Sequence, residues 1–220
     1  MKKGIMKKYA QAVVKFGANV KKNQYVVIRA SVRQAEFVEM LVEECYKAKA
    51  RFVKVEWGHD EISKLTYKNV KYETYIENIK MNEEKLKQMV DLLPVRIHVS
   101  DSDPDGMKGI DLSESLKARR DTYMDMKKYY DAMENKYQWV ICAMPSMAWA
   151  KKVFPNDKPA VAFKKLEQAI LDTTRIDDNA LKNWEQHVAN LTEKANILNE
   201  YNFDYLEYKS SNGTDFKVGL

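Results

Sequence analysis

The chain has 220 residues, of which 45% are hydrophobic and 31% charged, with only three His, two Cys and seven Gly. This length suits one large domain or two small ones, and the apolar fraction excludes a disordered chain. No stretch approaches the roughly 18 uncharged apolar residues of a membrane-spanning helix. The lysines near the N-terminus precede an amphipathic stretch, not the apolar run of a secretory signal. Two cysteines far apart in sequence favour a reducing, cytoplasmic location.

The positive charge is unevenly distributed. Residues 1–100 hold 20 basic and 12 acidic residues, whereas residues 101–220 hold 17 and 20. Proteins that read nucleic acids gather Arg for bidentate contacts, but here Lys outnumbers Arg 30 to 7 and is interleaved with Glu. We interpret the lysines as ordinary solvated surface and expect no nucleic-acid partner.

The first sixty residues predict a βαβ unit after an opening helix. Apolar residues recur at helical spacing over residues 6–16, and Gly17 follows as a stop signal. The continuous apolar run 25–28 predicts a strand buried on both faces. A helical stripe over residues 37–45 and a second strand at 52–57 follow. We therefore expect these two strands to be parallel, joined by a right-handed crossover.

The alternation of helices and strands continues to residue 201. Helical patterns lie at residues 61–81, 83–93, 113–135, 147–153, 159–171 and 179–201, and strand patterns at 95–100 and 139–143. This order predicts an α/β fold, a layered domain over residues 1–201 with a mainly parallel sheet flanked by helices.

The last residues follow a different pattern. Residues 203–208 alternate between apolar and polar, Asn212-Gly213 is a hairpin turn signal, and residues 215–218 resume the alternation. An isolated hairpin is only marginally stable. We expect residues 202–220 to be the first strands of a second, truncated domain.

The loop at Asp101–Gly106 has the D-x-D-x-D-G pattern of a calcium site. Its twelfth position should be a bidentate Glu but is Leu112, and a strand instead of a helix precedes it. The other interpretation is a set of Asx turns and helix caps. The loop also follows a strand of the parallel sheet, and ligands bind at that edge of such sheets.

Other residues with catalytic chemistry are scattered. No two of His59, His98 and His187 share the i, i+4 spacing of a zinc site. No glycine-rich phosphate loop follows either early strand. Cys142 lies among apolar residues, and we interpret it as a buried hydrophobic residue, not a nucleophile. Ser146 lacks the glycines of a nucleophile elbow.

The segment 144–155 carries Trp149 and Phe154 on a short helix bounded by Pro145 and Pro155. One interpretation is a clamp that packs a connection onto the core. The other is one wall of a cleft. The residues alone favour the clamp.

Taken in order, several runs resemble the thermophilic metal-dependent aminopeptidases, the family that includes aminopeptidase T and aminopeptidase S. The ordered set covers nearly the whole chain. The runs are Arg29-Ala30, Ala35–Val38, Val55–Trp57, Ser102–Asp105, Ala118–Arg120, Pro145–Pro155, Thr174-Arg175, Asn183-Trp184 with His187 and Leu191, Gly213–Asp215 and Val218–Leu220.

The resemblance implies a protein about twice this length. Its N-terminal α/β domain would precede a catalytic domain holding two divalent metal ions (zinc, cobalt or magnesium) on Glu, His, Asp and Tyr ligands. We therefore expect this segment to have no catalytic residue, metal ligand or cofactor, and to be inactive alone. The expected partners are its own C-terminal catalytic domain, a peptide substrate and a second copy in a homodimer.

Within this segment, the expected role is to wall the substrate cavity and to support packing or dimerisation. The candidates for the cavity wall are Arg29, Asp103, Asp105 and Trp149. The alternative is a free-standing α/β module that binds a small ligand near residues 101–105 or 29–33, without catalysis.

Overall fold

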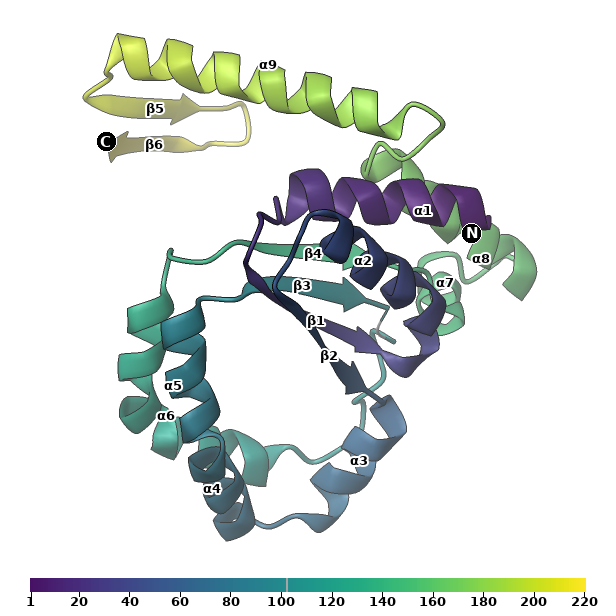
Figure 1. Cartoon of the computed structure of the whole chain (residues 1–220), viewed down its shortest axis with the longest axis vertical. Coiled ribbons are helices and arrows are strands. Elements are labelled where there is room, and N and C mark those ends of the chain that lie inside the picture. Colours follow the sequence, from purple (N-terminus) through teal and green to yellow (C-terminus); the bar gives the residue numbers. More distant parts are fainter. Residues whose placement is uncertain (102) are drawn as a thin grey trace. The chain divides into compact units, whose positions relative to one another are not determined.

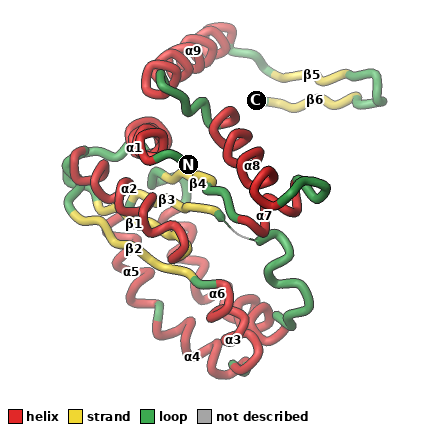
Figure 2. Tube along the Cα trace, turned by 90° about the vertical axis from the view of Figure 1, so that its right-hand side faces the viewer, coloured by secondary structure: helices red, strands yellow, loops and turns green. Residues whose placement is uncertain are grey.

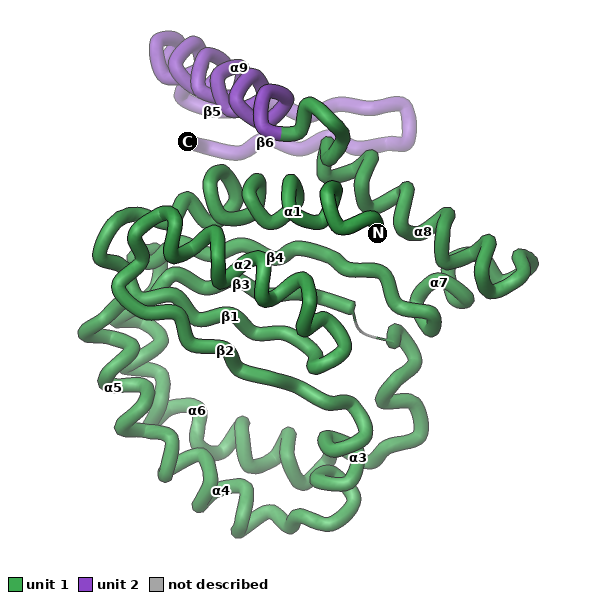
Figure 3. The backbone as a smooth tube through the Cα atoms, turned by 45° about the vertical axis from the view of Figure 1, so that its right-hand side comes forward, with its two compact units in different colours: residues 1–180 green, residues 181–220 purple. Residues whose placement is uncertain are grey.

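A computed structural model describes residues 1–101 and 103–220; Ser102, in the candidate loop, lies outside the described residues. The chain forms two compact units, Met1–Ala180 and Leu181–Leu220 (Figure 3). The unit boundary precedes the predicted domain boundary after residue 201, because nearly all of helix α9 (Ala180–Tyr201) groups with the hairpin that follows it. The domain boundary stays a prediction.

The first unit is built on a parallel sheet with strand order β2-β1-β3-β4 (Figure 1). Its strands are β1 (Tyr25–Ser31), β2 (Phe52–Gly58), β3 (Val95–Ser100) and β4 (Trp139–Ala143). Strand β1 is parallel to both β2 and β3, and β3 is parallel to β4. Helix α2 (Ala35–Lys47) connects β1 to β2, so the predicted parallel βαβ unit is confirmed.

One face of the sheet is covered by α1 (Lys3–Ala12), by a π-helical turn (Val13–Gly17) and by α2 (Figure 1). Val26, Ile28 and Val95 on this face are completely buried. The Tyr9 ring of α1 lies 5.3 Å from the Phe37 ring of α2. This face is the hydrophobic core of the unit.

Gly17 ends the opening helix as predicted, and its packing explains why a glycine stands there. A Cβ atom at this position would lie 2.8 Å from Cγ2 of Val140. The absence of a side chain therefore lets the π-helical turn approach strand β4 closely.

The opposite face of the sheet is largely uncovered, and the prediction that residues 25–28 are buried on both faces is wrong. Val26 and Ile28 are buried, but Tyr25 and Val27 are only partly so. On the same uncovered face, Phe52 of β2 is 50% exposed and Trp139 of β4 is 64% exposed. The helices that follow β2 pack mainly on one another, and α5 meets this face through Lys85, which pairs with Glu56, and Met89, which contacts Arg96.

Those helices are α3 (Asp60–Asn69), α4 (Tyr72–Met81), α5 (Glu83–Leu92) and α6 (Ser113–Met133). Helices α4 and α5 both pack against α6. The single helix expected over residues 61–81 is two helices, because Val70 and Lys71 are extended. The carboxylate of Glu114 accepts a hydrogen bond of 2.7 Å from the Tyr72 amide and so caps the second helix.

Helices α7 (Met147–Val153) and α8 (Pro159–Thr173) complete the first unit. In the second unit, strands β5 (Tyr205–Lys209) and β6 (Asp215–Gly219) pair antiparallel (Figure 2). Gly213 lies in the turn with φ of +92°, as the hairpin signal predicts. No helix among the described residues is long and apolar enough to cross a membrane.

Candidate functional site

The topological switch point of the sheet lies between the carboxyl ends of β1 and β3. From β1 the chain continues to β2 on one side, and β3 lies on the other. Ligands of open parallel sheets bind at such points. Here Asp101, the first residue after β3, is only 3% exposed. The loop after β1 brings Arg33 and Gln34 to it.

The Asp101 carboxylate is fully engaged by that loop. Arg33 Nε lies 3.1 Å and Gln34 Nε2 lies 2.9 Å from Asp101 Oδ2. Arg33 Nη2 donates a second bond, of 2.9 Å, to Asp60 at the start of α3. The hydrogen bond to Asp101 raises the pKa of Arg33, against the opposing effect of burial. The arrangement joins the ends of β1, β2 and β3 and acts as a structural clamp.

The predicted candidates Asp103 and Asp105 lie in the next turn. Asp103 Oδ1 accepts a hydrogen bond of 2.9 Å from the Asp105 amide, so the Asx-turn interpretation of this loop is confirmed. Asp105 pairs with Lys152 of α7 at 2.7 Å, and this hydrogen bond lowers the pKa of Asp105. Both carboxylates are thus already engaged by the protein.

Trp149 lies on α7, the helix that carries Lys152. Ser146 caps this helix through a hydrogen bond of 3.2 Å from the Trp149 amide. The Trp149 side chain is partly buried. The ion pair between Asp105 and Lys152 therefore brings three of the four candidates, Asp103, Asp105 and Trp149, to one part of the sheet edge.

Arg29 lies apart from these three, on the uncovered face of β1. Its register partners are Glu56 on β2 and His98 on β3. Partial burial and then the positive charge of Arg29 lower the pKa of His98. Among the described residues, Arg29 forms no hydrogen bond or ion pair with Asp103, Asp105 or Trp149.

Glu56 is the acidic neighbour of Arg29, and it forms an ion pair with Lys85 of α5. Partial burial would raise the pKa of Glu56, but the hydrogen bond and charge of Lys85, with Lys54 and Arg29, lower it overall. Glu56 thus has Lys85 as its ion-pair partner, and Arg29 is exposed, so that its guanidinium is accessible to an outside group.

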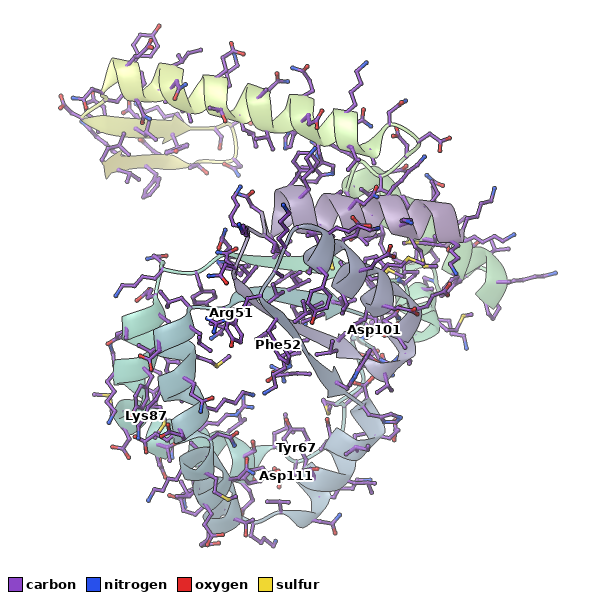
Figure 4. All side chains as sticks on the ribbon, in the orientation of Figure 1. Arg51, Phe52, Tyr67, Lys87, Asp101 and Asp111 are labelled. Atoms are coloured by element: carbon purple, nitrogen blue, oxygen red, sulfur yellow. The ribbon has the colours of Figure 1, made fainter. Side chains whose placement is uncertain are left out.

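The uncovered face combines aromatic, aliphatic and cationic side chains. Phe52, Trp139 and Ile141 stand on the two outer strands, and Arg29 and His98 stand on the inner ones. Figure 4 shows Phe52 on the side of the sheet away from α1 and α2. At the amino ends of β1 and β2, a pocket of about 150 Å³ lies between this face and α5. Parallel sheets are normally covered on both faces, so such exposure marks a functional surface or an interface.

The described residues do not fit a metal centre. Within residues 1–101 and 103–220, no three His, Cys, Asp or Glu side chains are grouped so that they could hold a metal ion. The carboxylates of Glu56, Asp101 and Asp105 are each paired with Lys or Arg. We therefore derive no metal-dependent step from these residues.

The two cysteines are also unsuited to catalysis. Cys45 and Cys142 are both buried, and burial raises the pKa of each thiol to about 12. The thiolate, the reactive form, is scarcely populated at neutral pH. The prediction that Cys142 is a buried hydrophobe is confirmed.

Two features were not predicted from the sequence. One is the pairing of Arg33 with Asp101, although both residues follow strands of one parallel sheet and that position could have suggested it. The other is the exposure of the sheet face that carries Arg29, because an apolar strand run looks the same whether or not a layer covers it.

Comparison with known proteins agrees with the ordered runs of the sequence. The family model described as thermophilic metalloprotease (M29) matches residues 2–220. Aminopeptidase AmpS of Bacillus subtilis (strain 168) is 33% identical over 214 residues, which is 96% of this chain and 52% of AmpS. Aminopeptidase T of Thermus thermophilus is 28% identical over 98% of this chain and 53% of its own length.

A solved structure shows the same relationship in three dimensions. The structure titled wild-type AmpT from Thermus thermophilus superposes with a TM-score of 0.76 at 27% identity. It covers 100% of this chain, and this chain covers 54% of it. The chain thus spans about half the length of the curated relatives it matches. With a family match over residues 2–220, the chain belongs to the M29 thermophilic metalloproteases.

Proposed function

We propose that the chain supplies the N-terminal domain of a metal-dependent aminopeptidase, which removes N-terminal residues from peptides. In this proposal the domain walls the substrate cavity, and the two divalent metal ions bind in the half of the protein that this chain does not span. The whole enzyme acts in the cytoplasm as a homodimer. The uncovered face of the sheet is the observation that carries the proposal.

The chemistry of this face suits a peptide. Phe52, Trp139 and Ile141 offer apolar contacts to side chains, and exposed Arg29 offers a bidentate donor to a carboxylate or carbonyl. His98 stays neutral near pH 7, because its pKa is lowered from an ordinary value near 6.5. A neutral imidazole can both donate and accept hydrogen bonds.

The alternative of a small-ligand module at the carboxyl edge of the sheet has less support. Asp101 and Asp105 are engaged by Arg33 and Lys152, so a ligand would have to displace an existing ion pair. Arg29, in contrast, is available without such a displacement.

The proposal is tested with the chain alone and with a chimera in which it replaces the matching half of aminopeptidase AmpS. The chain alone, given zinc, cobalt or magnesium, is expected to leave an aminoacyl chromogenic substrate uncleaved. The chimera is expected to cleave it, and Arg29→Ala is expected to raise KM for peptides about tenfold, as for a lost charged hydrogen bond.

Lys22→Ala is the matched control, since this exposed lysine lies outside the sheet, and its KM should not change. Metal-stimulated turnover by the chain alone would overturn the assignment of the metals to the other half. A folded chimera without activity, or an unchanged KM for Arg29→Ala, would overturn the cavity-wall role.

A further inference from the structure

Two pockets in the helical part of the first unit share a wall. The larger, of about 510 Å³, lies between α4, α5 and α6. The smaller, of about 210 Å³, lies between α3, α4 and α6. Asn78, Ile79 and Arg119 line both pockets, which are therefore adjoining parts of one surface. We call the two pockets together the Arg119 groove.

The smaller pocket is polar and lacks acidic side chains. Besides Arg119, hydroxyl groups dominate its lining: those of Ser63, Thr66, Tyr67, Tyr75 and Ser115. Ser115 and Arg119 lie one turn apart on α6 and face the same way. Figure 4 shows Tyr67 on α3 at this end of the unit. The hydroxyls of Ser63, Thr66 and Tyr75 already donate to backbone carbonyls. The Arg119 guanidinium, with no carboxylate in the lining, is therefore the group suited to an anion.

The acidic side chains closest to Arg119 along α6 are engaged elsewhere. Glu114 accepts from the Tyr72 amide at 2.7 Å. Asp121 accepts from the Tyr72 hydroxyl at 2.9 Å and from Arg120 Nε at 3.3 Å. Among the described residues, no ion pair or hydrogen bond of the Arg119 guanidinium is recorded. Both carboxylates thus have other partners, and the exposed guanidinium of Arg119 has no carboxylate of the protein beside it.

The larger pocket is mainly apolar. Met126 forms its buried part at 4% exposure, and Leu86, Met89, Tyr123 and Tyr130 complete the apolar lining. Lys85 also lines it but is paired with Glu56 of the sheet. No acidic residue lines this pocket either. Its volume exceeds that of a leucine side chain, and methionines adapt to apolar groups of different shapes.

A cationic end beside an apolar pocket suits an anion that carries an apolar group, such as a carboxylate next to an apolar side chain. We propose that the Arg119 groove binds the C-terminal residue of a short peptide, with its carboxylate on Arg119 and its side chain in the larger pocket. The choice of a peptide rests on the proposed function. Inorganic phosphate would satisfy Arg119 but would leave the apolar pocket empty.

The test is a titration of the chain with N-acetyl-leucine, followed by calorimetry and by amide NMR. N-acetyl-leucine amide and acetate are the matched ligands, the first without the charge and the second without the side chain. We expect saturable binding of N-acetyl-leucine with shifts at Asn78 and Ser115, and binding weaker by about tenfold for each matched ligand. Arg119→Gln is expected to weaken N-acetyl-leucine binding to the level of the amide.

Arg51→Gln is the matched control variant, because Arg51 is exposed, lies before β2 and lines neither pocket. It should bind as the unmodified chain does, and circular dichroism should show both variants folded. The proposal would be overturned by no binding, by equal binding of acid and amide, by equal losses in the two variants, or by inorganic phosphate binding as tightly as N-acetyl-leucine. Since binding needs no catalysis, this result is separable from the activity of the chimera.

Discussion

The hydroxyl of Tyr9 joins the opening helix to the far edge of the sheet, and its removal should destabilise the first unit. It donates to the Ala143 carbonyl at 3.2 Å and accepts from the Ala143 amide at 3.1 Å. Tyr9 is 2% exposed, so Tyr9→Phe preserves the packing but leaves the Ala143 amide without its partner. Tyr9→Phe removes both hydrogen bonds and leaves one buried donor unsatisfied, which together predict a loss of about 2–3 kcal/mol.

Urea unfolding followed by tryptophan fluorescence and circular dichroism would measure this loss. The midpoint should fall with an unchanged m-value, because the surface exposed on unfolding is the same. Tyr46→Phe is the matched control: the Tyr46 hydroxyl also accepts from a strand amide, that of Val53 at 3.3 Å, but Tyr46 is 48% exposed. Water can replace that bond, so the control should lose about 0.5 kcal/mol or less. Equal losses in the two variants would refute the argument that burial sets the magnitude.

Three further predictions concern the sheet and the groups packed against it. Gly17→Ala should lower the free energy of unfolding, measured in urea, by about 1–3 kcal/mol, because the added Cβ would meet Val140. Gly4→Ala, in α1 with open space around it, should raise the free energy of unfolding by about 0.5–1 kcal/mol. An unchanged stability of Gly17→Ala would contradict the close approach. His98 has a lowered pKa in the folded state, so below pH about 6.5 the unfolded chain binds more protons than the folded chain. The free energy of unfolding should therefore fall relative to that of His98→Gln as the pH is lowered, until the pH passes the folded pKa. A constant difference in free energy of unfolding between the two proteins from pH 8 to 5 would contradict this. Cys45 and Cys142 should not react with iodoacetamide at pH 8 until urea unfolds the chain, because both thiols are buried and have raised pKa values. Mass spectrometry would follow the labelling. Labelling of the folded chain would contradict this prediction.

The sequence predicts elements well where apolar periodicity is set by burial. Strands β3 and β4 have the predicted bounds, Val95–Ser100 and Trp139–Ala143. The break between α3 and α4 was missed because neither Pro nor Gly marks it. It depends on Glu114, far along the chain, which caps the Tyr72 amide. Distant partners of this kind are not visible in a local pattern.

The candidate site is less predictable than the elements because it depends on which layers are present. The loop at Asp101 was recognised as lying on the functional edge of the sheet, and its Asx turn follows from the short Asp side chains. The pairing of Asp101 with Arg33 can be predicted only when β1 and β3 are known to be neighbours, and local patterns do not specify the strand order. The Arg119 groove is lined by residues of α3, α4, α5 and α6, and no local pattern in the sequence indicated it.

The distribution of side chains on the uncovered face distinguishes a cavity wall from a plain packing interface. A packing interface has an apolar centre and a polar rim. Here apolar and charged side chains are mixed over the whole face: the inner strands carry Arg29 and His98 beside Tyr25 and Val27, and the outer strands carry Lys54 and Glu56 beside Phe52, Trp139 and Ile141. Cover from another domain would bury the apolar side chains at a gain of about 25 cal/mol per Å², but burying Arg29 without a partner would oppose that gain. Both requirements are met if the covering domain contacts the apolar side chains and leaves a wet cavity over Arg29, which is the arrangement that the proposed function needs.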